Sequence, residues 1–179
     1  MEAVADLAGV SRPLVYKHFV NRLALLGELR RREALRLHGE LASAVRSSTN
    51  VEEMFRTLVH AALQATDERG ALFAALRAAS GYSRELDREQ RDRDRVTTRF
   101  FSDRIVAEYG VAADAAEIVA AILLRGIDSV LEQFRSYRSA AHAAALEETY
   151  LLLVRAGLKA LPRPARRRNT RATRSGLDQ

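Results

Sequence analysis

The placement of proline most constrains the fold of this 179-residue chain. The three prolines are Pro13, Pro162 and Pro164, so residues 14–161 contain none. Because proline disrupts helix interiors and central strands, this stretch can form long uninterrupted elements. Alanine and leucine dominate it, and the alternation of apolar and polar residues that marks strands is missing. The sequence therefore predicts an all-α fold.

The composition narrows the class of protein further. The chain contains no cysteine, which excludes disulfides and thiolate metal sites. No run approaches the roughly 18 apolar residues of a membrane-spanning helix. The amino terminus also lacks the basic and apolar regions of a signal peptide. We therefore expect a soluble, cytoplasmic protein that has no membrane partner.

Residues 2–19 predict a helix, a three-residue turn and a second helix. The apolar stripe of the first helix ends at Gly9, which can adopt the positive φ of a helix C-terminus. Ser11 is the expected N-cap, with its hydroxyl accepting a backbone N–H, and Pro13 fits the first turn of the second helix. This spacing is typical of helix-turn-helix motifs that read the DNA major groove. Any compact pair of helices can, however, use glycine and serine in the same way.

The residues around this turn strongly resemble the TetR family of bacterial transcriptional repressors. The resemblance rests on Val4-Ala5, Ala8-Gly9-Val10-Ser11, Leu14-Val15-Tyr16-Lys17-His18-Phe19, Asn21-Arg22 and Leu25-Leu26. Beyond Leu26 the match is limited to the number and length of the helices. The resemblance implies that residues 12–19 include the recognition helix. The residues implied to bind DNA are Ser11, Arg12, Pro13, Tyr16, Lys17, His18 and Arg22.

The match to the family departs from its pattern in two places. Most members carry lysine where Arg22 stands, which is a harmless exchange for a phosphate contact. The family pattern also has a whole further helix ahead of Met1, and that helix packs across the apolar side chains of this motif. Without it, several of those side chains stay in water at roughly 1.5–3 kcal/mol each. Two hypotheses follow: Met1 is an internal methionine taken as the start, or the protein is a natural truncation.

Three regions are expected along the chain. Residues 1–45 form the helix-turn-helix and a linker helix capped by Asn21, and residues 46–161 form a helical ligand-binding and dimerisation domain. Within this domain we expect a capping box at Asn50 and Glu53, and a helix break at Gly70. Residues 162–179 hold six arginines against one aspartate, and we expect a disordered tail. This tail either tethers the protein to DNA phosphates or reflects a general preference for arginine over lysine.

The last two predicted helices indicate dimerisation. They run from about Asp114 to Phe134 and from Ser139 to Leu161, and both carry apolar residues on more than one face. A helix with two apolar faces needs a second partner, so we expect these helices to pair with their copies in a homodimer. The alternative is a central helix buried within one subunit. Two identical recognition helices related by a twofold axis would read a palindromic operator of double-stranded DNA.

A small-molecule effector could bind between the linker helix and the dimer helices and change the separation of the recognition helices. Arg125 and Asp128 lie one turn apart in an apolar helix, so they either neutralise each other or face a polar ligand. Aromatic residues at helical spacing are more often plain core. The residues predicted to line the pocket are Phe55, His60, Phe73, Phe100, Tyr109, Arg125, Asp128 and Phe134.

The sequence carries no sign of an enzyme. The four histidines are too scattered for a metal site on one helix, and there is neither a glycine-rich phosphate loop nor a nucleophile beside a base. We expect no cofactor and no bound metal. The sequence therefore predicts a ligand-responsive transcriptional regulator. The alternative is a dimeric small-molecule-binding or interaction protein that has lost DNA binding.

Overall fold

The computed structural model describes residues 1–80 and 83–161, and all regular structure within these ranges is α-helical. The predicted all-α fold class is confirmed. Residues 81–82 and the arginine-rich residues 162–179 lie outside the described residues. The helices are α1 (Glu2–Ala8), α2 (Arg12–His18), α3 (Arg22–Arg46), α4 (Val51–Ser80), α5 (Arg84–Tyr109), α6 (Ala113–Ser136) and α7 (Ala140–Lys159).

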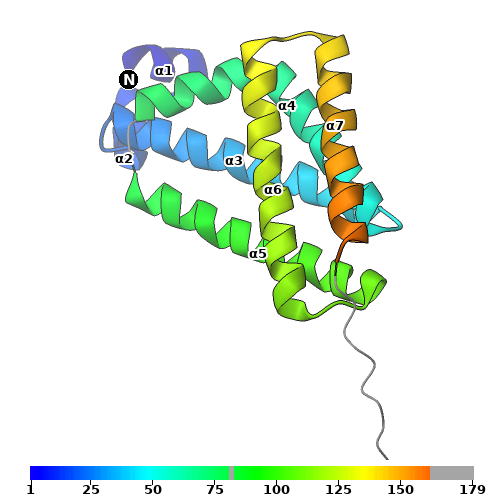
Figure 1. Ribbon diagram of the computed structural model, residues 1–179. Helices are drawn as coiled ribbons and strands as arrows, with labels where there is room; N and C mark the ends of the chain where they lie inside the picture. Colours follow the sequence, from blue (N-terminus) through cyan, green and yellow to red (C-terminus); the bar gives the residue numbers. More distant parts are fainter. Residues whose placement is uncertain (81–82, 162–179) are drawn as a thin grey trace, which may run out of the picture.

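The fold combines a pair of long helices, α3 and α4, with a helical hairpin formed by α6 and α7. Helix α4 runs back along α3, while α6 and α7 stand side by side and cross α4 (Figure 1). Helix α5 packs chiefly against α6. Helices α1 and α2 lie at the amino-terminal end of α3, at the opposite edge of the molecule from α7 (Figure 1). Among the described helices, none is long and apolar enough to cross a membrane.

Polar side chains cap the helices where the sequence places them. The Asn21 Oδ1 atom accepts a hydrogen bond from the Ala24 N–H at 2.9 Å and starts α3. The Ser139 hydroxyl oxygen accepts one from the His142 N–H at 3.1 Å and starts α7. Each cap satisfies a backbone donor that has no partner within its helix. The predicted starts of these two helices are confirmed.

The capping box predicted at the start of α4 forms only in part. The Asn50 Oδ1 atom accepts a hydrogen bond from the Glu53 N–H at 2.8 Å, as expected. The Glu53 carboxylate, however, accepts from the backbone N–H and the hydroxyl of Thr49, both at 2.6 Å. The pKa of Glu53 is lowered by these two hydrogen bonds. The return contact therefore reaches one residue further back than predicted.

The predicted helix break at Gly70 is wrong, because α4 continues from Val51 to Ser80. One glycine in a helix costs about 1 kcal/mol relative to alanine. The residues after Gly70 are mostly alanine and leucine, which favour helix and offset that amount. The glycine also has a packing role, because a Cβ at this position would lie 2.7 Å from Arg138 Nη2.

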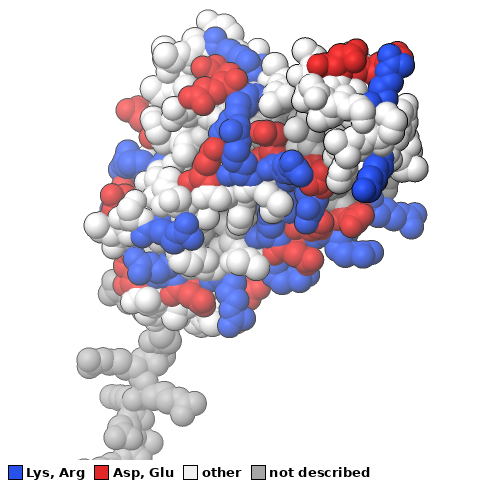
Figure 2. Space-filling model, turned by 180° about the vertical axis from the view of Figure 1, so that it is seen from behind, with Lys and Arg blue, Asp and Glu red and all other residues white. Residues whose placement is uncertain are grey.

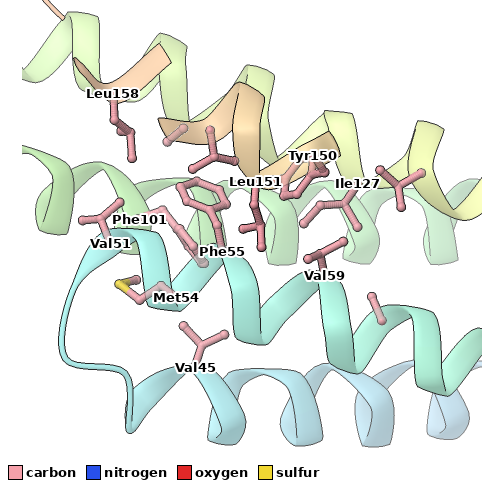
Figure 3. Close-up of a cluster of buried hydrophobic side chains, with 14 of the residues drawn as sticks. Val45, Val51, Met54, Phe55, Val59, Phe101, Ile127, Tyr150, Leu151 and Leu158 are labelled. Carbon is pink, nitrogen blue, oxygen red and sulfur yellow. The ribbon is translucent and has the colours of Figure 1, made fainter. Parts of the chain in front are cut away.

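One hydrophobic core joins α4, α5, α6 and α7, and Val45 of α3 packs into it (Figure 3). Phe55 of α4 is fully buried, and its ring centroid lies 4.7 Å from that of Phe101 and 6.4 Å from that of Tyr150. The Tyr150 hydroxyl donates a hydrogen bond to the Leu123 carbonyl at 2.8 Å, so its polar end is satisfied. Each large apolar side chain buried here contributes about 1.5–3 kcal/mol. This core fixes α6 and α7 relative to α4.

Candidate functional site

The turn between α1 and α2 has the predicted left-handed geometry. Gly9 follows α1 with φ 64° and ψ 30°, a conformation that glycine adopts without strain. The Val10 N–H donates to the Ala5 carbonyl at 3.0 Å, which closes the end of α1. The chain then turns into α2 within three residues. The helix, turn and helix predicted for residues 2–19 are therefore present in the structure.

Ser11 precedes α2 in extended conformation, as an N-cap does, but its side chain makes no capping hydrogen bond. This part of the prediction is wrong. A capping hydroxyl accepts from the second or third helical residue. Here the second is Pro13, which has no N–H, and the N–H of the third, Leu14, donates to the Ser11 carbonyl at 3.0 Å. Both donors are thus unavailable to the hydroxyl.

The predicted DNA-binding side chains are all accessible to solvent. Only Val15 of α2 is buried, whereas the rest of that helix is exposed. Lys17 and His18 lie in its last turn, and Arg22 opens α3 just after it. The exposed residues from the prediction are Ser11, Arg12, Pro13, Tyr16, Lys17, His18 and Arg22. They all lie within one short segment, residues 11–22, that a phosphate or a base edge could approach.

Arg12 has a partner that the sequence analysis missed. Its guanidinium forms an ion pair with the Glu2 carboxylate, which ties the start of α2 to the start of α1. Both side chains are more than half exposed, so the pair adds little stability. Arg12 would have to exchange Glu2 for a phosphate in order to bind DNA. Only the folded turn brings residues 2 and 12 together.

The apolar side of the α1–α2 unit is largely uncovered. Ala5 and Val15 are buried, but Leu7 is 91% exposed. Other large apolar side chains around the turn are also exposed: Val4, Val10, Leu14, Val20 and Leu23. Apolar patches of this kind mark surfaces that contact another molecule or segment.

A second exposed apolar surface lies on the α6–α7 hairpin. Ile118 and Ile122 lie one turn apart on α6 and are 61% and 64% exposed. Leu152 and Leu153 of α7 are exposed to the same degree. Because α6 and α7 are antiparallel neighbours, the beginning of α6 lies beside the end of α7 (Figure 1). The four side chains therefore lie at the same end of the hairpin.

A cavity of about 840 Å³ opens between α3, α5 and α6, with α4 as its floor. Its lining mixes apolar side chains with charges of both signs. The cationic lining residues are Arg46, Arg91, Arg95 and Arg125, and the acidic ones are Asp94, Glu117 and Asp128. At its side α5 is tied to α3, because the Arg31 Nε atom donates to both carboxylate oxygens of Glu89 at 3.1 Å.

His38 of α3 is a half-buried member of this lining. Burial lowers the pKa of His38 below its ordinary value, and the positive charge of Arg93 lowers it further. The negative charge of Asp94 opposes the shift. This shift favours the neutral imidazole, which can both donate and accept a hydrogen bond.

A second cavity, of about 710 Å³, lies between α3, α4 and the carboxyl end of α6. Leu37, Leu41, Ala62 and Leu131 line both cavities, so the two adjoin. The wall from α4 is built of small side chains: Ala62, Ala65, Gly70, Ala71, Ala74 and Ala78. This cavity was not predicted from the sequence, although the small residues that recur at helical spacing in α4 could have indicated it.

The eight predicted pocket residues do not share one cavity. Phe100, Arg125 and Asp128 line the larger cavity, and Phe73 lines the smaller one. Arg125 and Asp128 are exposed and form no ion pair with each other. The remaining four line neither of these cavities: Phe55 and Phe134 belong to the packed core, His60 pairs with Glu147 on the surface, and Tyr109 is half-buried.

Charges on the visible rear face of the molecule are mixed. Figure 2 shows basic and acidic side chains interspersed over its middle, with no broad field of one sign. Charged side chains of α3 and α5 also pair with one another, as in the Arg31–Glu89 and Arg93–Glu89 contacts. A face of this kind does not attract a polyanion along its whole length.

Comparison with protein-family models and with curated proteins finds no match to this chain. Within the described part of the chain, no group of three or more histidine, aspartate or glutamate side chains is arranged to hold a metal ion.

Proposed function

We propose that this protein is a TetR-like, ligand-responsive transcriptional regulator that binds palindromic DNA as a homodimer, acting as a repressor in the cytoplasm. The observation that carries the proposal is the α1–α2 unit. Gly9 adopts a left-handed conformation, and α2 presents Tyr16, Lys17 and His18 to solvent directly after the turn. A helix exposed in this way can enter the major groove with its side chains on bases and phosphates.

The α6–α7 hairpin supplies a reason for two copies. Ile118, Ile122, Leu152 and Leu153 remain mostly exposed after the core has formed. Pairing this surface with its own copy removes all four from water in each subunit. The resulting twofold axis places two copies of α2 so that they read inverted half-sites about one helical turn apart.

The two cavities supply a route from a ligand to α2. Leu37 and Leu41 of α3 line both cavities, and α3 begins at Arg22, four residues after the end of α2 at His18. A molecule that prefers one position of α3 therefore biases the separation of the two copies of α2. Its differential affinity for the two positions is the whole of the required mechanism, and no catalytic step is involved.

A second function is favoured by a different observation. The apolar side of α1 and α2 is open, with Leu7 almost fully exposed, and Arg12 is held by Glu2. With its apolar side uncovered, this helix-turn-helix unit has few packing contacts that hold it in place. The second candidate is a dimeric ligand-binding or interaction protein that uses α6 and α7 but does not bind DNA.

A titration of DNA at low salt separates the two functions. The chain has two lysines, Lys17 in α2 and Lys159 at the end of α7, which gives a matched pair of variants. Under the proposal, Lys17→Ala and Tyr16→Phe weaken DNA binding measured by fluorescence anisotropy, while Lys159→Ala binds like the wild type. Wild-type protein that shows no binding at low salt supports the second candidate. Equal binding by all variants shows that α2 is not the reading helix.

A further inference from the structure

The smaller cavity has an unusual distribution of charge. Its walls are apolar, formed by leucines of α3, alanines and Phe73 of α4, and Leu131 of α6. Its charged lining residues are Arg135 and Arg138, and no acidic side chain joins them among the described lining residues. The neighbouring larger cavity, in contrast, carries both signs. The smaller cavity thus combines an apolar interior with a purely cationic edge.

The two arginines lie at the carboxyl end of α6 and in the turn that follows. Arg135 is in the last turn of α6, and Arg138 lies in the connection to α7. Both residues are exposed, so their guanidinium groups are at the mouth of the cavity. Neither forms an ion pair with a described carboxylate. Their charges are therefore open to a ligand.

Arg138 is held close to the wall of α4. Its Nη2 atom donates to the Thr66 carbonyl at 3.4 Å, and the absence of a side chain at Gly70 makes room for it. A contact of that length is weak, and one guanidinium has five N–H donors. Arg138 can therefore keep its place against α4 and still donate to an anion.

We infer that this cavity binds an anionic amphiphile, namely an apolar molecule that carries one carboxylate. The apolar body lies between Leu37, Phe73 and Leu131, and the carboxylate accepts hydrogen bonds from Arg138 and Arg135 at the mouth. Charge-assisted pairing of guanidinium with carboxylate is strong and directional. A cavity of about 710 Å³ falls in the range of small-molecule sites.

Binding in this cavity does not depend on the proposed function, but its effect on DNA rests on it. Leu37 and Leu41 come from α3, the helix that follows α2. An amphiphile seated against them contacts the element that positions the recognition helix. Occupation would then change the affinity for DNA in a reciprocal manner.

Isothermal titration calorimetry of the full chain with three ten-carbon probes tests the inference. The probes are decanoate, 1-decanol and decyltrimethylammonium, each kept below its micellar concentration. We expect decanoate to bind at least about tenfold more tightly than decanol, because only the anion gains the charge-assisted hydrogen bonds. We expect decyltrimethylammonium to bind least. Preference for decanol or for the cation would overturn the inference, since it would show that the two arginines do not select an anion.

Substitutions test whether decanoate binds in this cavity. Arg138→Met should weaken decanoate binding by about tenfold and leave decanol binding unchanged. Arg104→Met, an exposed arginine of α5 that lines neither cavity, is the matched control and should bind decanoate like the wild type. Ala74→Phe fills the apolar part and should abolish binding of decanoate and decanol alike. Circular dichroism checks that each variant remains folded.

The cavity inference and the proposed function can be refuted independently. Decanoate that does not bind, or that binds Arg138→Met and Ala74→Phe as it binds the wild type, overturns the cavity inference. Decanoate that binds with the expected pattern to a protein without affinity for DNA upholds the cavity inference and overturns the proposed function.

Discussion

The exposed apolar surface of α6 and α7 makes a quantitative prediction about dimerisation. Ile122 is 64% exposed in the single chain. Truncation to alanine removes three carbon groups, each worth about 0.8 kcal/mol when buried, so each subunit would lose about 1.5 kcal/mol at this exposure. A twofold interface contains the residue twice, which gives about 3 kcal/mol. Ile122→Ala should therefore raise the dimer dissociation constant about a hundredfold.

Sedimentation equilibrium over a range of protein concentrations measures this constant directly. Leu7→Ala is the control, because Leu7 is even more exposed but lies on α1, far from α7 (Figure 1). It should leave the constant within roughly twofold of the wild type. A wild-type chain that sediments as a monomer at all concentrations refutes the reasoning. An Ile122→Ala chain that dimerises as tightly as the wild type refutes it as well.

Three further changes probe the core, the turn and the cavity. Phe55→Ala should lower the free energy of unfolding by about 3–5 kcal/mol. Phe100 is 43% exposed, so Phe100→Ala should lower it by much less. Equal losses of unfolding free energy in urea titrations would contradict the core assignment. Gly9→Ala introduces a Cβ that meets no neighbour, so its cost is the left-handed backbone alone, about 1 kcal/mol. Hydrogen exchange at the Val10 amide should therefore quicken about fivefold, and an unchanged rate would exclude strain at this turn. Because the pKa of His38 is lowered from 6.5, the folded chain binds fewer protons than the unfolded chain and loses stability as the pH falls from about 7 through that lowered value. His38→Gln should flatten the fall in unfolding free energy between pH 7 and pH 5, and an identical fall in both proteins would show that His38 is not its source.

Local chemistry explains why much of the fold could be predicted. Proline placement and apolar periodicity predict long helices, and Asn21 and Ser139 start α3 and α7 as their side chains favour. Gly9 adopts the left-handed conformation expected of it. Each of these features depends on residues within one turn of the chain, so it can be recognised without knowledge of the tertiary structure.

The errors arise where tertiary contacts or neighbouring residues decide. Gly70 does not end a helix, because α4 is held by packing on both sides and Arg138 occupies the space beside the glycine. Ser11 does not cap α2 through its hydroxyl, because Pro13 removes one donor. The cap rule, applied to Ser11 alone, omitted the effect of Pro13.

The candidate site was predictable only where it lies on one segment. The exposed side chains from Ser11 to Arg22 are close in sequence, and a pattern can identify them. The cavities instead combine α3, α4, α5 and α6, whose relative placement no local pattern specifies. Aromatic residues were therefore a poor guide: Phe55 fills the core, whereas alanines of α4 leave the space.

Selection of bound sequences from a random duplex library by the full chain at low salt tests the central claim most directly. The account predicts enrichment of an inverted repeat whose half-sites lie about one helical turn apart, since two copies of α2 related by a twofold axis read the same bases. Enriched sequences without inverted symmetry would contradict the dimeric arrangement. A library recovered without enrichment would contradict DNA reading by α2.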